Sequence, residues 1–404
     1  MTIIKGGVCA PKGFLASGIH CGIRKNKAKR DLALIYTKTK ASAAAVYTTN
    51  KVKGAPLTVT KNNISNGYAN AIICNSGNAN TCNANGIEIA ELTCELLANE
   101  LGIDKTDVVV ASTGVIGQPL DITPIKIGIP SLVGQLSFDG SENAAEGIMT
   151  TDTTKKEIAV SFNIDGKECK IGGIAKGSGM IHPNMATMLV FITTDCAITP
   201  EMLNKALRSD IKNTFNMVSV DGDTSTNDMV TVLANGEAGN TIIDKEGESF
   251  NEFMKALNTI TVYLCRQIAA DGEGATKLLE CKVSGAKDDN NAKIIAKSVI
   301  CSSLVKAAMF GSDANWGRIL CAIGYSGADV DITKVDVSFE SSVGAIKVCE
   351  NGAGIDFSED LAKQILLKDE ISILVNLGDG EAKSVAWGCD LTYDYVKING
   401  DYRT

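Results

Sequence analysis

Short apolar runs typical of strands and longer periodic stretches typical of helices follow one another along this chain. Met188–Ile192 is an unbroken apolar run of the kind that forms a buried strand. Gly86–Leu101 and residues 249–270 instead place their apolar residues at helical spacing. Two shorter apolar segments, 31–36 and 43–48, predict two strands near the beginning of the chain. Both helices and strands are therefore expected.

Two further strands are predicted to end in turns of small residues. Ala71–Asn80 and Val108–Gly117 each begin with apolar residues and end with glycine and short polar residues. Such a turn can direct a backbone N–H and a hydroxyl to one point, which is what a developing oxyanion requires. A tight turn with only a structural role explains the same pattern.

The stretch 176–192 joins an irregular segment to a rigid one. Its first half contains two glycines and Pro183, which favour turns, and the apolar strand follows directly after Thr187. A residue at such a junction can be held in place beside a bent peptide bond, which suits a nucleophile. On the pattern alone, β propensity is sufficient reason for a threonine at this position.

Residues 180–189, Met-Ile-His-Pro-Asn-Met-Ala-Thr-Met-Leu, resemble the self-cleavage segment of the arginine-biosynthesis glutamate N-acetyltransferase and ornithine acetyltransferase family. The resemblance implies cleavage between Ala186 and Thr187, after which Thr187 is the catalytic nucleophile. Cleavage would also create a base, because a terminal α-amine has a pKa of about 7.7 to 8.0. The chain contains only two histidines, so a serine–histidine or multi-histidine metal site has little to draw on. One of them, His182, could assist processing or be structural.

The same resemblance extends over essentially the whole chain, including residues 10–14, 30–35, 46–53, 303–320 and 388–404. It implies that Thr113 and Gly114 form the oxyanion hole. The residues that it implies for substrate binding are Thr153, Lys176, Thr187, Glu273, Asn399 and Thr404. From the residues alone, a strand-entry turn explains Thr153, a solvated surface position explains Lys176, and a helix stop at Gly272 explains the segment around Glu273.

The fold that the resemblance implies is α/β, with a layered αββα catalytic core of the self-processing, N-terminal-nucleophile-like type and smaller α/β domains toward the C-terminus. We expect residues 1–197 to form the catalytic core, 198–280 a middle α/β domain, and 281–404 a C-terminal α/β domain with a docked tail. The resemblance also implies an α chain of residues 1–186 and a β chain of residues 187–404, assembled as an α2β2 heterotetramer.

The loop 219–228 is rich in aspartate and threonine, which suggests a calcium loop at first sight. It fails that test because Thr226 occupies the position of the required glycine and Val232 that of the bidentate glutamate. We interpret it as an acidic loop near the active site or an interface.

Composition narrows the class of protein. Over 404 residues, 45% are hydrophobic and the formal net charge is −8, which argues against nucleic acid as a partner. The basic cluster 24–30 is the local exception, and a solvated loop explains it. The thirteen cysteines form no CxxC pair, and there is neither a signal-like segment nor an apolar run of membrane-spanning length. We therefore expect a cytoplasmic chain with reduced thiols and no membrane contact.

The activity implied by the resemblance is transfer of the acetyl group from N2-acetylornithine to glutamate through an acetyl-threonine enzyme. Acetyl-CoA is a further possible donor, for which the sequence shows no discriminating motif. No metal or prosthetic group is expected. Two alternatives remain open: a self-processing amidohydrolase or aminopeptidase in which water is the acceptor, and a binding or structural protein that stays uncleaved.

Overall fold

The computed structural model describes residues 1–182 and 188–400. In these ranges a nine-stranded sheet has the order β1-β6-β7-β8-β10-β3-β4-β5, with β2 paired to β3. Its strands are β1 (Thr2–Ile4), β2 (Phe14–Ile19), β3 (Leu32–Tyr47), β4 (Tyr68–Asn78), β5 (Val108–Val115), β6 (Lys156–Ile164), β7 (Lys167–Lys176), β8 (Leu189–Thr194) and β10 (Met229–Ala234).

Three buried apolar clusters separate four layers in this part of the molecule. Neighbouring residues of β4 point to opposite sides, so that Ile72 packs in a cluster with Phe191 of β8, whereas Ile73 packs with Leu97 on the helical side. The first of these clusters fills the space between the β3–β5 part and the β7, β8 and β10 part of the sheet. A third cluster joins Val190 of β8 to Ile260 of the helix behind it. The predicted αββα layering is therefore confirmed.

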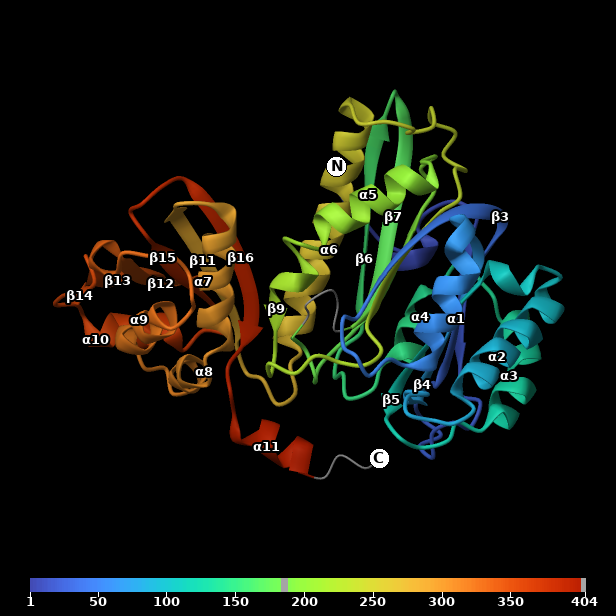
Figure 1. The fold of residues 1–404 in the computed structure, drawn as a ribbon, viewed down its shortest axis with the longest axis horizontal. Coiled ribbons are helices and arrows are strands. Elements are labelled where there is room, and N and C mark those ends of the chain that lie inside the picture. The colour runs from blue at the N-terminus through green and yellow to red at the C-terminus, as the bar shows by residue number, and fades with distance from the viewer. Residues whose placement is uncertain (183–187, 401–404) are drawn as a thin grey trace.

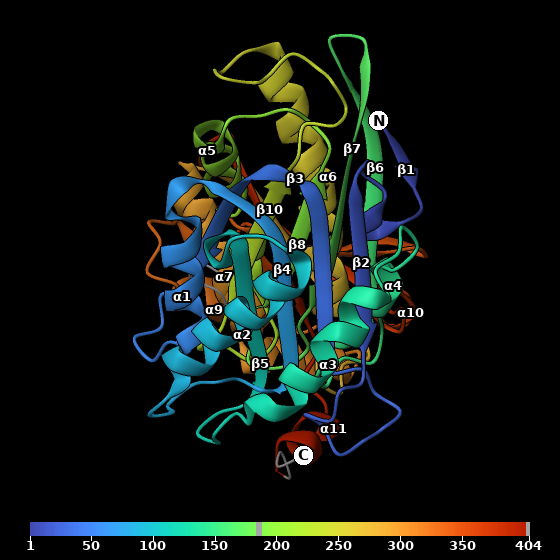
Figure 2. The same cartoon turned by 90° about the vertical axis from the view of Figure 1, so that its right-hand side faces the viewer.

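Helices cover both outer faces of these strands (Figures 1 and 2). In Figure 2, α1 (Ala55–Asn63), α2 (Gly86–Leu101) and α3 (Ile122–Gly134) lie in front of the β3–β5 layer. The helices α4 (Ser141–Ile148), α5 (Pro200–Asp210) and α6 (Glu248–Ala270) follow. Of these, α4 packs against β2 and β3, whereas α6 packs against β6 and β7.

The predicted helix 86–101 agrees with α2, and the predicted helix 249–270 agrees with α6 to within one residue. The prediction of two separate strands in 31–48 was wrong, because β3 runs through both. Its pairing with β4 shifts register between Tyr36 and Ala41, so the exposed, polar middle of the strand interrupts the apolar pattern without ending the strand.

A seven-stranded sheet, counted over the same described ranges, has the order β14-β13-β12-β15-β11-β16-β9. Its strands are β9 (Val218–Ser219), β11 (Leu278–Ala286), β12 (Asp336–Ser341), β13 (Gly344–Glu350), β14 (Ala353–Gly354), β15 (Glu370–Asn376) and β16 (Ala382–Cys389). The accompanying helices are α7 (Asp289–Cys301), α8 (Ser303–Phe310), α9 (Trp316–Gly324) and α10 (Glu359–Leu366). The short 3-10 helices of the chain are η1 (Gly7–Cys9), η2 (Ile64–Asn66), η3 (Lys105–Asp107), η4 (Phe215–Met217) and η5 (Ile332–Lys334).

The two sheets are connected by α6 and by residues 218–229. Helix α6 lies between them and packs against β11 and β16 as well as β6 and β7 (Figure 1). Residues 218–229 leave the seven-stranded sheet at β9 and enter the nine-stranded sheet at β10. The segment 198–280 thus supplies strands to both sheets, and the proposed division into three domains stays a prediction.

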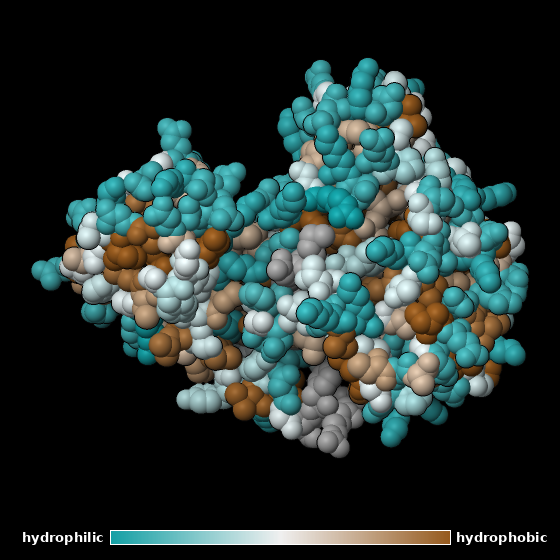
Figure 3. Space-filling view, viewed as in Figure 1, coloured by the Kyte–Doolittle hydropathy of each residue, from teal (hydrophilic) through white to brown (hydrophobic). Residues whose placement is uncertain are grey.

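The last described element is the helix α11 (Tyr393–Gly400), which lies at the bottom of Figure 1. Hydrophilic residues cover much of the face in Figure 3, in keeping with the net charge of −8. Within the described ranges, every helix is too short or too polar to span a membrane. The basic cluster 24–30 is more than a solvated loop, since Arg24 donates to the carbonyl of Met149 (2.5 Å) and Arg30 pairs with Glu146 (2.9 Å).

Candidate active site

A cavity of about 310 Å³ lies where the ends of the first sheet meet the segment 218–229 and helix α11. It brings together five of the residues that the sequence singled out, although these lie up to 286 positions apart. They are Thr113, Gly114, Lys176, Glu273 and Asn399. The other lining residues are Ala79, Val115, Ile116, Thr150, Thr151, Gly179, Met180, Ser225, Thr226 and Asn227. Ala186, Thr187 and Thr404 lie outside the described residues, so their predicted roles stay predictions.

Thr113 and Gly114 form the end of β5, where it pairs in parallel with Ser76 and Gly77 of β4. The φ angle of Gly114 is +133°, and a Cβ atom on it would lie 2.4 Å from the carbonyl carbon of Gly77. Only glycine fits a backbone position with this φ and this close contact. The glycine predicted for this position is therefore required by the backbone, and Thr113 is largely buried beside it. The oxyanion role of the two residues stays a prediction.

Lys176 is the last residue of β7 and pairs with Leu189 at the start of β8. It is 8% exposed, so the solvated surface position considered for it is excluded. The residue that follows the predicted nucleophile, Met188, is also fixed, because its carbonyl accepts a hydrogen bond from Met229 of β10 (2.9 Å). The cavity wall and the described start of β8 are thus parts of one hydrogen-bonded sheet.

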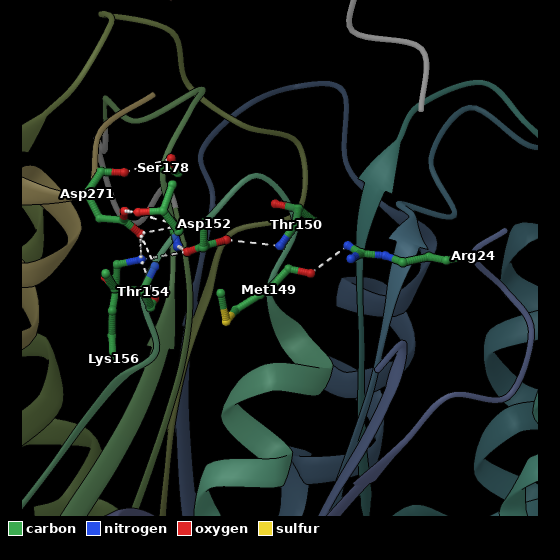
Figure 4. A network of polar contacts seen from close by, with 10 residues as sticks. Arg24, Met149, Thr150, Asp152, Thr154, Lys156, Ser178 and Asp271 are labelled. Atoms are coloured by element: carbon green, nitrogen blue, oxygen red, sulfur yellow. Dashed lines mark hydrogen bonds and ion pairs between the residues drawn. The ribbon is translucent and has the colours of Figure 1, made fainter. Parts of the chain in front are cut away.

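A buried ion-pair network lies behind this wall (Figure 4). Lys156 is fully buried and contacts Asp152 (2.7 Å) and Asp271 (2.5 Å). Asp152 in turn accepts hydrogen bonds from the backbone N–H of Gly177 (2.7 Å) and of Thr150 (3.0 Å). The network therefore fixes three wall segments: the threonine cluster, the glycine-rich segment after β7, and the end of α6.

Charge dominates over burial at Asp152. Burial alone would raise the pKa of this carboxyl. The ammonium groups of Lys176 and Lys156, together with the hydrogen bonds from Lys156 and from the backbone N–H of Thr150, hold that pKa below its usual value. Asp152 is accordingly ionised at neutral pH, as a buried carboxylate with two cations beside it should be.

Thr153, for which the resemblance implies substrate binding, does not line this cavity. Its hydroxyl and its backbone N–H donate to Asp271, and it lines a separate hollow beside α11 rather than the cavity. Thr150 and Thr151, from the same hydroxyl cluster, line the cavity instead. Substrate binding by Thr153 stays a prediction. The described contacts of Thr153 with Asp271 have a structural role.

Glu273 and Asn399 line the cavity beside the glycine-rich segment that follows β7. Asn399 of α11 donates to a carboxylate oxygen of Glu273 (2.8 Å), and the backbone N–H of Glu273 donates to Ser178 (2.9 Å). The tail is further attached where Thr392 donates to the carbonyl of Gly274 (2.7 Å). An anionic Glu273 and a cationic Lys176 in one small cavity suit an amino acid, which carries both signs of charge.

His182 lies outside the cavity lining and is half-buried. Its Nδ1 atom is 3.1 Å from the hydroxyl oxygen of Ser219. Burial lowers the pKa of His182 to about 4, with a further decrease from Lys297 and an opposing effect from Asp221. The imidazole is therefore neutral at pH 7, and its part in processing stays a prediction.

Comparison with known proteins shows the family of this chain. The ArgJ family model matches residues 15–404. The chain belongs to the ArgJ family. It is 51% identical to the arginine biosynthesis bifunctional protein ArgJ of Caldanaerobacter subterraneus subsp. tengcongensis, over 100% of both chains. It is 52% identical to ArgJ 1 of Clostridium acetobutylicum, over 97% of this chain and 96% of that one. A crystal structure of ArgJ from Bacillus halodurans is 47% identical with a TM-score of 0.50, and covers 52% of this chain and 98% of its own.

The segment 219–228, which we interpret from the sequence as an acidic loop near the active site or an interface, supplies Ser225, Thr226 and Asn227 to the cavity lining. Asp221 accepts hydrogen bonds from Met180 (2.6 Å) and Ile181 (2.9 Å), which fixes the described chain before the predicted cleavage point. Asn227 lines the cavity and was not singled out at all. The only signal for Asn227 in the sequence is its place two residues before a buried strand, with Asp228 in between.

Proposed function

We propose that this protein transfers the acetyl group of N2-acetylornithine to glutamate through an acetyl-Thr187 intermediate, after cleavage of its own chain at Ala186–Thr187. The observation that carries the proposal is that the Thr113–Gly114 turn, Lys176 and Glu273 line the same cavity, beside the start of β8. Membership of the ArgJ family, with relatives named as bifunctional proteins of arginine biosynthesis, supports it.

In the first stage, the Thr187 hydroxyl attacks the carbonyl carbon of Ala186 and forms an ester, which water hydrolyses into two chains. This step frees the α-amine of Thr187, which can then accept a proton from its own hydroxyl. The solved chain of the relative from Bacillus halodurans supports this stage. It matches over 98% of its own length and covers 52% of this chain, which is the share expected of one of two cleaved chains.

In the second stage, Thr187 takes the acetyl group and ornithine leaves. The amine of glutamate then attacks the acetyl ester and regenerates the threonine. The hydroxyl of Thr113 and the backbone N–H of Gly114 stabilise the oxyanion in both halves of the reaction. The amino-acid substrates would be held by Thr153, Lys176, Glu273, Asn399 and Thr404. This scheme needs neither a metal nor a prosthetic group.

Three finer points belong to the same proposal. Acetyl-CoA would serve as a second donor, for which the word bifunctional in the relatives' names is the support. The cleaved chains would assemble as an α2β2 heterotetramer. The protein would act in the cytoplasm, where reduced thiols persist, and every cysteine of the described chain is free.

Intact-mass spectrometry and a transfer assay test the proposal together. We expect two chains, 1–186 and 187–404, and ornithine release from acetylornithine that depends on glutamate. Thr187→Ala should give one uncleaved, inactive chain. Ornithine release at the same rate without glutamate would favour the amidohydrolase alternative, and full activity of the Thr187→Ala chain would refute the scheme.

A further inference from the structure

The side-chain amide of Asn227 uses its full hydrogen-bonding capacity, and all four partners are described. Its Nδ2 atom donates to the carbonyl of Ala79 (2.6 Å) and to that of Ser112 (2.9 Å). Its Oδ1 atom accepts from the hydroxyls of Thr81 (2.6 Å) and Thr226 (2.6 Å). Two carbonyl oxygens can only accept, so the amide has one orientation that satisfies every partner.

Asn227 is 5% exposed and its surroundings are closely packed. A Cβ atom on Gly54 would lie 2.5 Å from the Nδ2 atom of Asn227, so the neighbouring backbone must be glycine. That backbone also donates to the carbonyl of Thr226 (2.9 Å). The amide is therefore held from several sides and cannot rotate without breaking hydrogen bonds in the protein interior.

The two carbonyls that Asn227 holds lie next to the oxyanion turn at Thr113 and Gly114. Ser112 directly precedes Thr113 in β5, and the N–H of Ala79 donates to the carbonyl of Val115 just beyond the turn (2.9 Å). Asn227 thus holds one end of the turn directly, at Ser112, and the other end indirectly, through the backbone of Ala79. Asn227 lies after the predicted cleavage point, whereas both carbonyls lie before it, so the bonds would join the two chains of the processed protein.

We propose that Asn227 is a positioning residue for the oxyanion turn, and that it acts through Thr113 and Gly114 rather than on the substrate. The inference rests on the proposed function, because it assigns a role in the same acyl transfer. It also predicts that cleavage and acetyl transfer both depend on Asn227, since both place an oxyanion at this turn.

The decisive variant is Asn227→Asp, which keeps the shape of the side chain and replaces the two N–H donors with a carboxylate oxygen facing two carbonyls. We expect the cleavage rate of freshly made precursor and the kcat for acetyl transfer to fall about 100-fold, with KM changed by less than about threefold. Asn235→Asp is the matched control. Asn235 is equally buried, lies just after the other end of β10, and donates to the carbonyl of Lys12 (2.8 Å) far from the cavity. It should leave kcat and cleavage within about threefold of the native values.

The pH dependence provides a readout that a purely structural role would not change. Burial beside two carbonyls raises the pKa of the introduced carboxyl above the ordinary value for aspartate, against the opposing effect of the Lys176 ammonium in the same cavity, as burial does for the adjacent Asp228. The protonated form of the introduced carboxyl can donate one hydrogen bond again. The deficit of Asn227→Asp relative to the native enzyme should therefore shrink as the pH falls, whereas Asn235→Asp should show no such trend in kcat.

Thr81→Val is the second variant, for use if Asn227→Asp does not fold. It removes one hydroxyl that orients the amide and keeps the side-chain shape, so kcat should fall about tenfold while the melting temperature falls by only a few degrees or so. Cleavage and turnover equal to the native enzyme in either folded variant would overturn the inference. Native protein that cleaves normally but lacks acetyl transfer would refute the proposed function alone.

Discussion

The two sides of the cavity are built in different ways. The oxyanion side consists of backbone groups held by neutral hydrogen bonds between strands, with Gly114 packed directly against Gly77. The substrate side is backed by buried charges, with Lys156 between Asp152 and Asp271. Losing a neutral hydrogen bond displaces the groups that it positions and costs little free energy of unfolding. Removing one partner of a buried ion pair costs much more, because it leaves a buried charge without a partner. Damage to the first side should thus reduce catalysis, and damage to the second should reduce stability.

The largest expected effect is that of Lys156→Met, which would leave two carboxylates without their shared cation. We expect a loss of about 3 to 5 kcal/mol in the free energy of unfolding, measured by denaturant titration. Lys155→Met is the matched control, since Lys155 is the residue next to Lys156 and pairs with Glu142 and Glu146 at the surface. That change should cost less than about 1 kcal/mol. Equal losses of unfolding free energy for the two variants would contradict the idea that buried charges stabilise the substrate side.

Gly114→Ala tests the oxyanion side. The added Cβ would overlap Gly77 and displace the turn, so kcat and the cleavage rate should fall about 100-fold to 1000-fold. Gly117→Ala is the control, because Gly117 also has a positive φ, +77°, but a Cβ on it would meet no atom within 4 Å. It should lower stability by about 1 kcal/mol and leave kcat nearly unchanged. A Gly117 variant as inactive as the Gly114 variant would show that strain alone, rather than the contact with Gly77, explains the loss.

The pH dependence of stability sharpens the comparison from the charged side. The pKa of Asp152 is lower in the folded protein than in the unfolded chain, so the carboxylate contributes stability above about pH 4 and loses it as the pH falls through the folded pKa. The difference in unfolding free energy between native protein and Asp152→Asn should therefore be largest at pH 7 and shrink below about pH 4. A difference that grows on acidification would contradict the depressed pKa.

What the sequence could predict follows the same division. Local patterns sufficed for α2, whose C-cap Gly102 has the positive φ (+68°) typical of a helix end, and for the glycine turn at the end of β5. The charged network could not be predicted, because Lys156 stands in a Lys-Lys-Glu sequence that is typical of a protein surface. Its partner Asp271 lies 115 positions further along the chain, and only the fold brings the two side chains together. Likewise, five consecutive polar residues from 150 to 154 do not indicate which threonine faces the cavity, and the fold selected Thr150 and Thr151.

The smallest effect is expected at Glu273, which lies on the substrate side of the cavity. Glu273→Gln removes the negative charge and keeps the shape, so KM for acetylornithine should rise about tenfold, while kcat should fall less than threefold or so. The reason is that a charge that holds the substrate's ammonium group contributes equally before and during the reaction, unlike a contact made to the oxyanion. Glu280→Gln is the control, as Glu280 pairs with Arg266 and accepts from Trp387 (2.7 Å) away from the cavity. It should change thermal stability and leave KM unaltered. A fall in kcat with constant KM for Glu273→Gln would instead place that carboxylate among the groups that act on the reacting atoms.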